Sequence, residues 1–153
     1  MRLVRLGATL LLGLVVACGS DNTTGPGTNL PNGTFSMQVN GSSFQAISAT
    51  VLITGNIIAI GAGTAANEAM GMAWVDAGPR TYTVNTDVGT NGNYNAAGSG
   101  AWTASTGTGS GSITVTTRAA NRVAGTFSFV MQPVAGTAAS GTRTVTGSFD
   151  LTF

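Results

Sequence analysis

The stretch GSITVTTRAANRVAGTFSFVM, residues 111–131, indicates the fold more clearly than any other part of the chain. Its apolar residues occupy every second position on both sides of a polar centre, and they are Ile113, Val115, Val123, Phe127, Phe129 and Met131. Alternation with a period of two is typical of strands that bury one face. The polar centre, TRAANR, has the composition of a turn. The stretch therefore predicts an antiparallel hairpin whose two strands share one core.

The second arm of this hairpin has an echo near the end of the chain. VAGTFSF at 123–129 and VTGSFDL at 145–151 share the pattern Val-x-Gly-x-Phe-x-apolar. The apolar positions again fall at every second residue, and they place Gly125 and Gly147 on the inward side. Glycine inside a strand often marks a bulge, a bend or a close backbone approach. Two copies at unequal spacing do not make a repeat array, so we interpret them as one packing solution used twice.

The rest of the chain extends the same pattern. Strand-like alternation begins at Phe35, and an Asn40-Gly41 turn follows. Two further strands flank Gly55. The next strand contains Met70, Met72 and Trp74 on one face. Tyr82 and Val84 share a face, and 94–103 is a weaker strand region. Convincing helical periodicity is absent. We predict an all-β, antiparallel fold of about eight to ten short strands, either a two-sheet sandwich, our first choice, or a closed calycin-like barrel.

Composition excludes several classes of function. Charged residues make up 7% of the chain, against about 25% in typical domains. The six cationic residues are all arginines, and there is no basic run that would hold phosphates, so nucleic acid is not an expected partner. Histidine is absent, which removes Ser-His-Asp catalysis and the common zinc sites. We therefore expect a non-enzymatic protein without a cofactor.

The front end predicts a membrane anchor. Arg2 and Arg5 precede an apolar run at 6–17, which has the layout of a secretory signal and is too short to span a bilayer. The run ends in Val-Val-Ala-Cys, which resembles the lipobox of bacterial lipoproteins. That resemblance implies cleavage between Ala17 and Cys18 and a diacylglyceryl group on Cys18. In lipoproteins of diderm bacteria, an Asp directly after the cysteine is associated with retention in the inner membrane. Gly19 stands at that position here, so the resemblance implies the outer membrane.

The chain then divides into three parts. Residues 1–17 are the predicted signal peptide. Residues 18–33 start at the lipidated cysteine and continue as a tether rich in Gly, Asn, Thr and Pro, which cannot bury enough surface to fold. Residues 34–153 form a single domain, large enough to build a core without disulfides.

Three segments of this domain resemble a family of uncharacterised β-rich domains found in bacterial lipoproteins. They are FSMQVNGSSFQA, GSITVTTRAANRVAGTFSF and GSFDLTF, and the resemblance covers most of 33–153. The segments are structural hairpins, and the family has no activity that could be carried over. The resemblance implies the fold and the cell-envelope location, and it adds no site residue.

Aromatic residues supply the first candidate site. Trp74, Tyr82, Tyr94 and Trp102 could form a platform for a glycan, because such side chains bury a large area at low entropic cost. Packing in the core is the alternative interpretation, and we favour it. Trp102, which lies in a Gly- and Ser-rich region, is the one expected to be exposed.

Oxygen ligands supply the second candidate site. Asp87, Asn91, Asn93 and Asn95 offer the hard oxygens that suit calcium, but an Asn-Gly-rich hairpin loop explains them equally well. Glu68 and Asp76 are a further carboxylate pair, although eight residues of strand need not bring them together.

Function is predicted only at the level of class. The sequence favours a lipid-anchored cell-envelope protein that binds or scaffolds a partner, attached to membrane lipid through Cys18. One alternative is a barrel that carries a small apolar ligand in a cavity lined by Met70, Met72 and Trp74. The other is a glycan-binding module. The partner, the oligomeric state and the side of the membrane stay open.

Overall fold

The computed structural model describes residues 29–30 and 32–153, and its regular structure is entirely β. The strands are β1 (Asn29–Leu30), β2 (Gly33–Val39), β3 (Ser42–Thr54), β4 (Ile57–Thr64), β5 (Glu68–Val75), β6 (Thr81–Thr83), β7 (Asn91–Ala96), β8 (Gly100–Ala104), β9 (Ser110–Ala119), β10 (Arg122–Pro133) and β11 (Arg143–Thr152). Within these residues no helix is long and apolar enough to cross a membrane. The predicted all-β class is confirmed.

Hydrogen bonding closes the sheet on itself. The order β2-β3-β4-β5-β7-β8-β10-β11 returns to β2, because β11 pairs with both β10 and β2. Every one of these neighbouring pairs is antiparallel. Strands β9 and β6 extend the sheet beyond β10, and β1 pairs with β2. The pairing supports the closed barrel, which was the second of the two predicted architectures.

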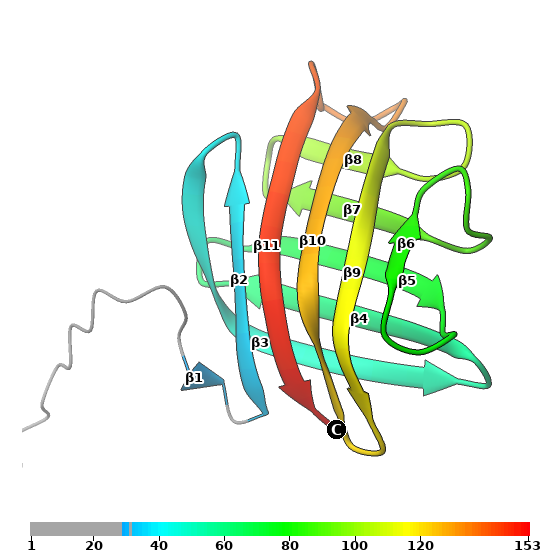
Figure 1. Cartoon of the computed structure of the whole chain (residues 1–153). Coiled ribbons are helices and arrows are strands. Elements are labelled where there is room, and N and C mark those ends of the chain that lie inside the picture. The colour runs from blue at the N-terminus through cyan, green and yellow to red at the C-terminus, as the bar shows by residue number, and fades with distance from the viewer. Residues whose placement is uncertain (1–28, 31) are drawn as a thin grey trace, which may run out of the picture.

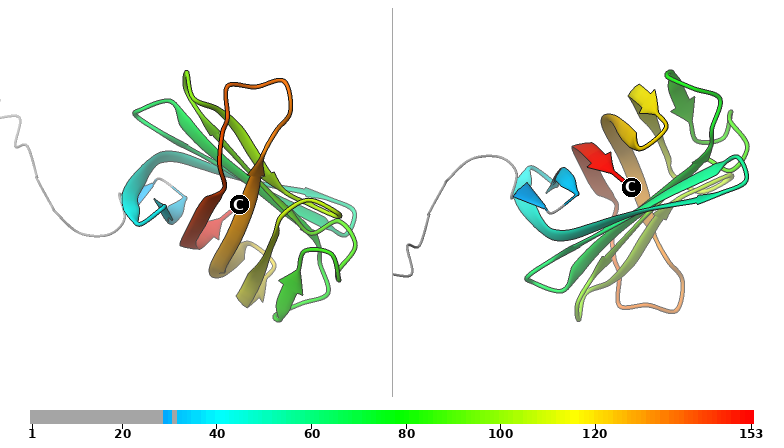
Figure 2. Two further views of the ribbon diagram at one scale, coloured as in Figure 1. Left: turned by 90° about the horizontal axis from the view of Figure 1, so that it is seen from above. Right: turned by 90° about the horizontal axis from the view of Figure 1, so that it is seen from below.

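The barrel is flattened into two layers whose strands cross steeply. In Figure 1, β2, β11, β10 and β9 stand upright in front, and β3, β4, β5, β7 and β8 run across behind them. Figure 2 shows the same two layers from above and below. Strand β3 joins the layers: it pairs with β2 up to Gln45 and with β4 from Ala46 onward. A register shift between Ala46 and Ser48 marks the bend, as bulges do in barrels.

The second junction between the layers is shorter. Strand β10 pairs with β9 from Arg122 to Val130, and only Gln132 and Pro133 then reach β8. This seam is where the barrel closes. The Val134 amide adds a backbone hydrogen bond to Ala101 O at 2.8 Å just beyond these pairs.

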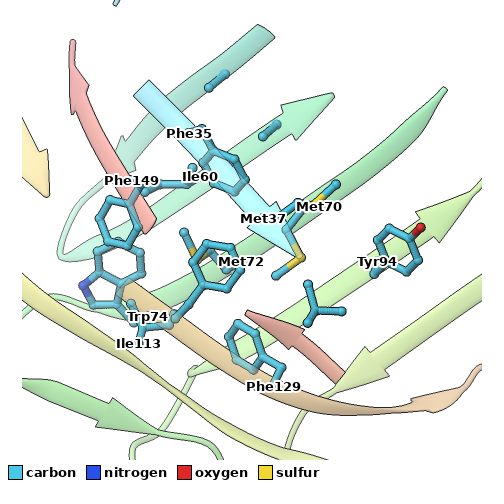
Figure 3. Close-up of a cluster of buried hydrophobic side chains, with 14 of the residues drawn as sticks. Phe35, Met37, Ile60, Met70, Met72, Trp74, Tyr94, Ile113, Phe129 and Phe149 are labelled. Carbon is cyan, nitrogen blue, oxygen red and sulfur yellow. The ribbon is translucent and has the colours of Figure 1, made fainter. Parts of the chain in front are cut away.

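Large side chains fill the space between the layers. Those that are almost completely buried include Trp74, Trp102, Tyr82, Phe35, Phe129, Ile58, Met70, Ile113, Met131, Leu151, Val123 and Val145. Figure 3 shows Phe149, Trp74, Met72 and Phe129 directed toward one another from both layers. The inner faces predicted from the period-two pattern are therefore confirmed.

The two Val-x-Gly-x-Phe segments pair with each other. In the β10–β11 ladder Gly125 lies opposite Phe149, and Phe127 lies opposite Gly147. Each phenylalanine ring covers the glycine of the other segment, because a Cβ built on Gly125 would lie 2.9 Å from Phe149 Cζ and one on Gly147 would lie 2.5 Å from Phe127 Cζ. Of the three features that strand glycines mark, both positions show a close approach, and the register of β10 against β9 also shifts at Gly125.

The folded part reaches further back than the predicted boundary at residue 33. Leu30, the one large apolar residue of the predicted tether, is 7% exposed and lies in β1, which pairs with β2. Burial of this side chain gives the segment a reason to join the sheet. Ala17 and Cys18 lie outside the described residues, so the cleavage site and the lipid anchor stay predictions.

Candidate functional site

The four predicted platform aromatics are all buried, so the prediction of an exposed glycan platform is wrong for them. Trp74, Tyr82, Tyr94 and Trp102 are each at most 2% exposed. They form two ring pairs, Trp74–Tyr82 at 6.0 Å and Tyr94–Trp102 at 5.8 Å between ring centroids. The strand alternation that places the neighbouring methionines inside also turns these rings inward, which is the core packing that the sequence favoured.

Asp87, the charged member of the predicted calcium site, already accepts hydrogen bonds with both carboxylate oxygens. Its Oδ2 accepts a hydrogen bond from the Thr83 amide at 2.7 Å, and its Oδ1 accepts one from Arg80 Nη2 at 2.6 Å. These contacts, the amide first, hold the pKa of Asp87 below its usual value. The carboxylate therefore closes a turn and pairs with an arginine.

The asparagines of the same prediction lie along one outward face. Asn91, Asn93 and Asn95 alternate outward on β7. Asn93 donates to Asn91 Oδ1 at 3.4 Å and accepts from Thr103 Oγ1 at 2.9 Å. In the described part of the chain no three His, Cys, Asp or Glu side chains gather where they could hold a metal ion. The arrangement is a ladder of amides on a strand and does not form the predicted calcium cage.

Glu68 and Asp76 lie at the two ends of β5. Strands rise about 3.3 Å per residue, which puts the two carboxylates roughly 25 Å apart. Asp76 accepts from Arg118 Nε at 2.7 Å. They cannot act on one glycosidic bond, which requires carboxyl groups within about 10 Å.

Glu68 instead belongs to a cluster at one end of the barrel. Tyr94 Oη donates to Glu68 Oε1 at 2.6 Å, and the Glu68 amide donates to Thr64 Oγ1 at 3.2 Å. Oε2 of Glu68 is buried and has no hydrogen-bond partner among the described residues. Burial, and then the carboxylate of Glu68, raise the pKa of the Tyr94 hydroxyl well above its ordinary value. This end of the barrel therefore holds a neutral phenol against a carboxylate.

Trp102 connects this pair to Arg143. Arg143 is the first residue of β11, and its guanidinium carbon lies 4.7 Å from the centroid of the Trp102 ring. Trp102 Nε1 donates to Gly141 O at 2.9 Å, and this bond fixes the indole against the loop that leads into Arg143. The Tyr94–Trp102 pair, 5.8 Å apart, continues the contact toward Glu68. These four residues come from β5, β7, β8 and β11, and Trp102 lies opposite Pro133 at the short β8–β10 seam.

Arg143 differs from the other arginines of the described chain. Arg80, Arg118 and Arg122 each form an ion pair, with Asp87, Asp76 and Asp150 respectively. Arg143 has no carboxylate partner among the described residues, although its guanidinium carbon lies over the Trp102 ring, 4.7 Å from the centroid. A planar guanidinium in this state presents its donors to carboxylate or phosphate oxygens. Sequence reasoning missed this residue because neither Arg143 nor Trp102 carries a local motif, and only closure of the barrel brings them together.

The comparisons with known proteins place the chain in a family. A protein-family model described as a domain of unknown function, DUF6252, matches residues 31–152. The chain belongs to this family. The expectation of an uncharacterised domain is thereby confirmed, and the match begins within the segment that carries β1 and β2. Neither the curated proteins nor the solved structures gave a match to this DUF6252 chain.

The raised pKa of Tyr94 gives a first testable prediction. The pKa of Tyr94 is higher in the folded than in the unfolded protein. Its contribution to stability is therefore fully present below the unfolded pKa of about 10, and it is lost as pH rises through the folded pKa. We expect urea unfolding to show a loss of roughly 1 kcal/mol in stability one pH unit above that unfolded value. Tyr94→Phe should remove the loss and Tyr82→Phe should keep it. An alkaline loss that survives in Tyr94→Phe would contradict the assignment.

Proposed function

We propose that this DUF6252 chain is a lipid-anchored protein of the bacterial cell envelope that binds a partner outside the cytoplasm and catalyses no reaction. The anchor rests on the basic, apolar and Val-Val-Ala-Cys segments that end at Cys18. Two or more acyl chains hold a protein stably on a membrane where one does not. The outer membrane is the proposed location because Gly19 follows the cysteine.

The binding role rests on Arg143. This guanidinium lies over the ring of Trp102, whose Nε1 donates to Gly141 O in the loop before Arg143, and it has no ion-pair partner within the described residues. Its side chain is partly exposed, so a partner can reach it. The ligand chemistry that matches it is an anionic group, either a carboxylate or a phosphate.

The two alternative functions have weaker support. The carrier function required a cavity lined by Met70, Met72 and Trp74, and these side chains are buried in the packed core with other large residues between them. The glycan function required exposed aromatic rings, and the four candidates are buried. An enzymatic function has no histidine to use, and Asp76, Asp87 and Asp150 are held in ion pairs.

Mass spectrometry of the protein extracted from its own membrane tests the anchor. We expect a chain that begins at Cys18 and carries the added mass of a diacylglyceryl group and a further acyl chain. The variant Cys18→Ser should lose the added mass and leave the membrane fraction. An unmodified Cys18 in the membrane-derived protein would refute the anchor.

A nuclear magnetic resonance titration tests the binding site. The indole N–H signal of Trp102 should shift when phosphate or acetate is added, because the anion would bind Arg143 on the face of that ring. Trp74 gives the other indole signal and serves as an internal reference. Arg143→Gln should abolish the shift, whereas Arg122→Gln should not. A shift that persists in Arg143→Gln, or no shift in the original chain, would refute the site.

A further inference from the structure

The outer face of the back layer carries no charged side chain. Its outward positions follow from the alternation of five strands, and they are Ser48, Thr50, Leu52, Thr54, Ile57, Ala59, Gly61, Gly63, Ala69, Gly71, Ala73, Val75, Asn91, Asn93, Asn95, Ala101 and Thr103. Cross-strand pairing makes the surface continuous, since Thr50, Gly61, Gly71 and Asn93 lie side by side. We call it the uncharged face. All charged residues of the described chain lie elsewhere, in loops, at strand ends or on the front layer.

One end of this face is aliphatic. Leu52 is 65% exposed and Ile57 46%, and both lie on the outward side of the hairpin that joins β3 to β4, whereas Ile53 pairs with the buried Ile58 and faces the other side. Ile57 lies opposite Val75, and Gly89 approaches Val75 so closely that a Cβ there would be 3.2 Å from Val75 Cγ2. Val88, the neighbour of Gly89, is 85% exposed. We call Leu52, Ile57 and Val88 the hairpin patch.

We propose that the uncharged face lies on a lipid bilayer, with the hairpin patch inserted at the level of the lipid head groups. The proposal depends on the lipid anchor of the proposed function. The chain from Cys18 to Asn29 spans at most about 40 Å, and a domain of this size measures roughly 35 Å across. Every surface of the domain, including the hairpin patch, therefore stays within reach of the membrane that holds the anchor.

The shape and chemistry of the patch fit lipid better than a protein. It lies at the end of a hairpin that projects to the right in Figure 1, whereas β1 lies on the opposite side of the same molecule. The predicted tether therefore enters the domain at the end of the molecule away from the patch. The patch has only aliphatic side chains, whereas protein interfaces favour tryptophan, tyrosine and arginine as anchors. Asn91, Asn93 and Asn95 provide hydrogen-bonding groups for lipid head groups at the other side of the face.

Flotation with vesicles of phosphatidylethanolamine and phosphatidylglycerol tests the proposal. The protein is the chain from residue 18 with Cys18→Ser, which carries no lipid and keeps every strand pair of the barrel. We expect it to float with the vesicles, and the bound fraction should not fall in high salt because the face has no charge. Leu52→Ser with Ile57→Ser should lower the partition coefficient about tenfold or more. Val130→Ser, on the front layer and 41% exposed, is the matched control and should change it little.

Several results would overturn the proposal. They are an original chain that does not float, a loss in Val130→Ser equal to that in the double variant Leu52→Ser with Ile57→Ser, or binding that salt removes. Sedimentation of the same proteins tests for a second occupant. A dimer that the double variant converts to a monomer would assign the face to a second copy of the chain. A failure of flotation would not argue against the lipid anchor, because the anchor is tested separately by the added mass on Cys18. Thermal melting confirms that each variant is folded.

Discussion

Replacing Gly147 by alanine is expected to lower the free energy of unfolding by about 3 kcal/mol. The added Cβ would lie 2.1 Å from the backbone oxygen of Ser36 and 2.5 Å from Phe127 Cζ. The oxygen belongs to β2, which pairs with β11 over seven residue pairs, so it cannot move away without breaking the barrel's closure. Chemical denaturation of the two proteins would measure the difference directly.

A matched substitution shows whether the effect comes from crowding. Gly71 lies in the middle of β5, and a Cβ on it would have no neighbouring atom within 4 Å. Gly71→Ala should therefore be neutral, or stabilise by about 0.5–1 kcal/mol, because alanine loses less backbone freedom on folding. Equal losses at Gly71 and Gly147 would mean that the tight approach between β11 and β2 is not what holds Gly147 in place.

A second substitution separates the ring contact from the backbone contact. Phe127→Leu in the Gly147→Ala background removes the ring that covers the glycine, but it leaves the Ser36 oxygen where it was. We expect little recovery of stability. Full recovery would show that the phenylalanine ring alone excludes a side chain at residue 147.

The sequence predicted this part of the fold because its signals are local. Alternation with a period of two identifies which side chains are buried, and Asn40-Gly41 marks a turn, which the structure confirms with φ values of 49° and 85°. The internal echo was also visible in the sequence. Its cause was not, because the pairing of Gly125 with Phe149 and of Phe127 with Gly147 depends on register between two strands.

Closure of the barrel was harder to predict than its strands. A sandwich and a closed barrel require the same alternation along each strand, and they differ only in whether the outermost strands pair. Here the difference rests on β11 pairing with β2 and on two residue pairs between β8 and β10. The local sequence around Gln132 and Pro133 does not predict that these residues pair with β8.

The candidate site was the least predictable part. The aromatic residues were considered as an exposed platform, with core packing favoured, and the alternation that defines the strands buries Tyr94 and also Trp102, the one expected to be exposed. Glu68 was considered with Asp76 because both are acidic, but its contact is Tyr94, 26 residues away in sequence. No sequence pattern pointed to Arg143, because an arginine at the start of a strand is common. Its contact with the Trp102 ring depends on the tertiary fold.

Replacing Trp74 by alanine is expected to be the most damaging substitution in the core, with a loss of about 3–5 kcal/mol. Trp74 is fully buried, and its ring centroid lies 6.0 Å from that of Tyr82 and 6.1 Å from that of Phe149. The indole thus connects β5 of the back layer to β11 of the front layer. The loss is a large part of the stability of a typical domain, about 5–15 kcal/mol, so the variant is best measured at low temperature in denaturant.

The same substitution at the two tryptophans should have unequal costs. Trp74 Nε1 is buried without a partner among the described residues, whereas Trp102 Nε1 donates to Gly141 O at 2.9 Å. Trp74→Phe removes an unpaired donor, whose burial costs about 1–3 kcal/mol, and this offsets part of the lost packing. Trp102→Phe breaks the hydrogen bond from the indole to Gly141 O. We therefore expect Trp102→Phe to destabilise the domain by about 1–2 kcal/mol more than Trp74→Phe. An equal or larger cost at Trp74 would show that its indole N–H has a partner inside the barrel, such as a buried water molecule.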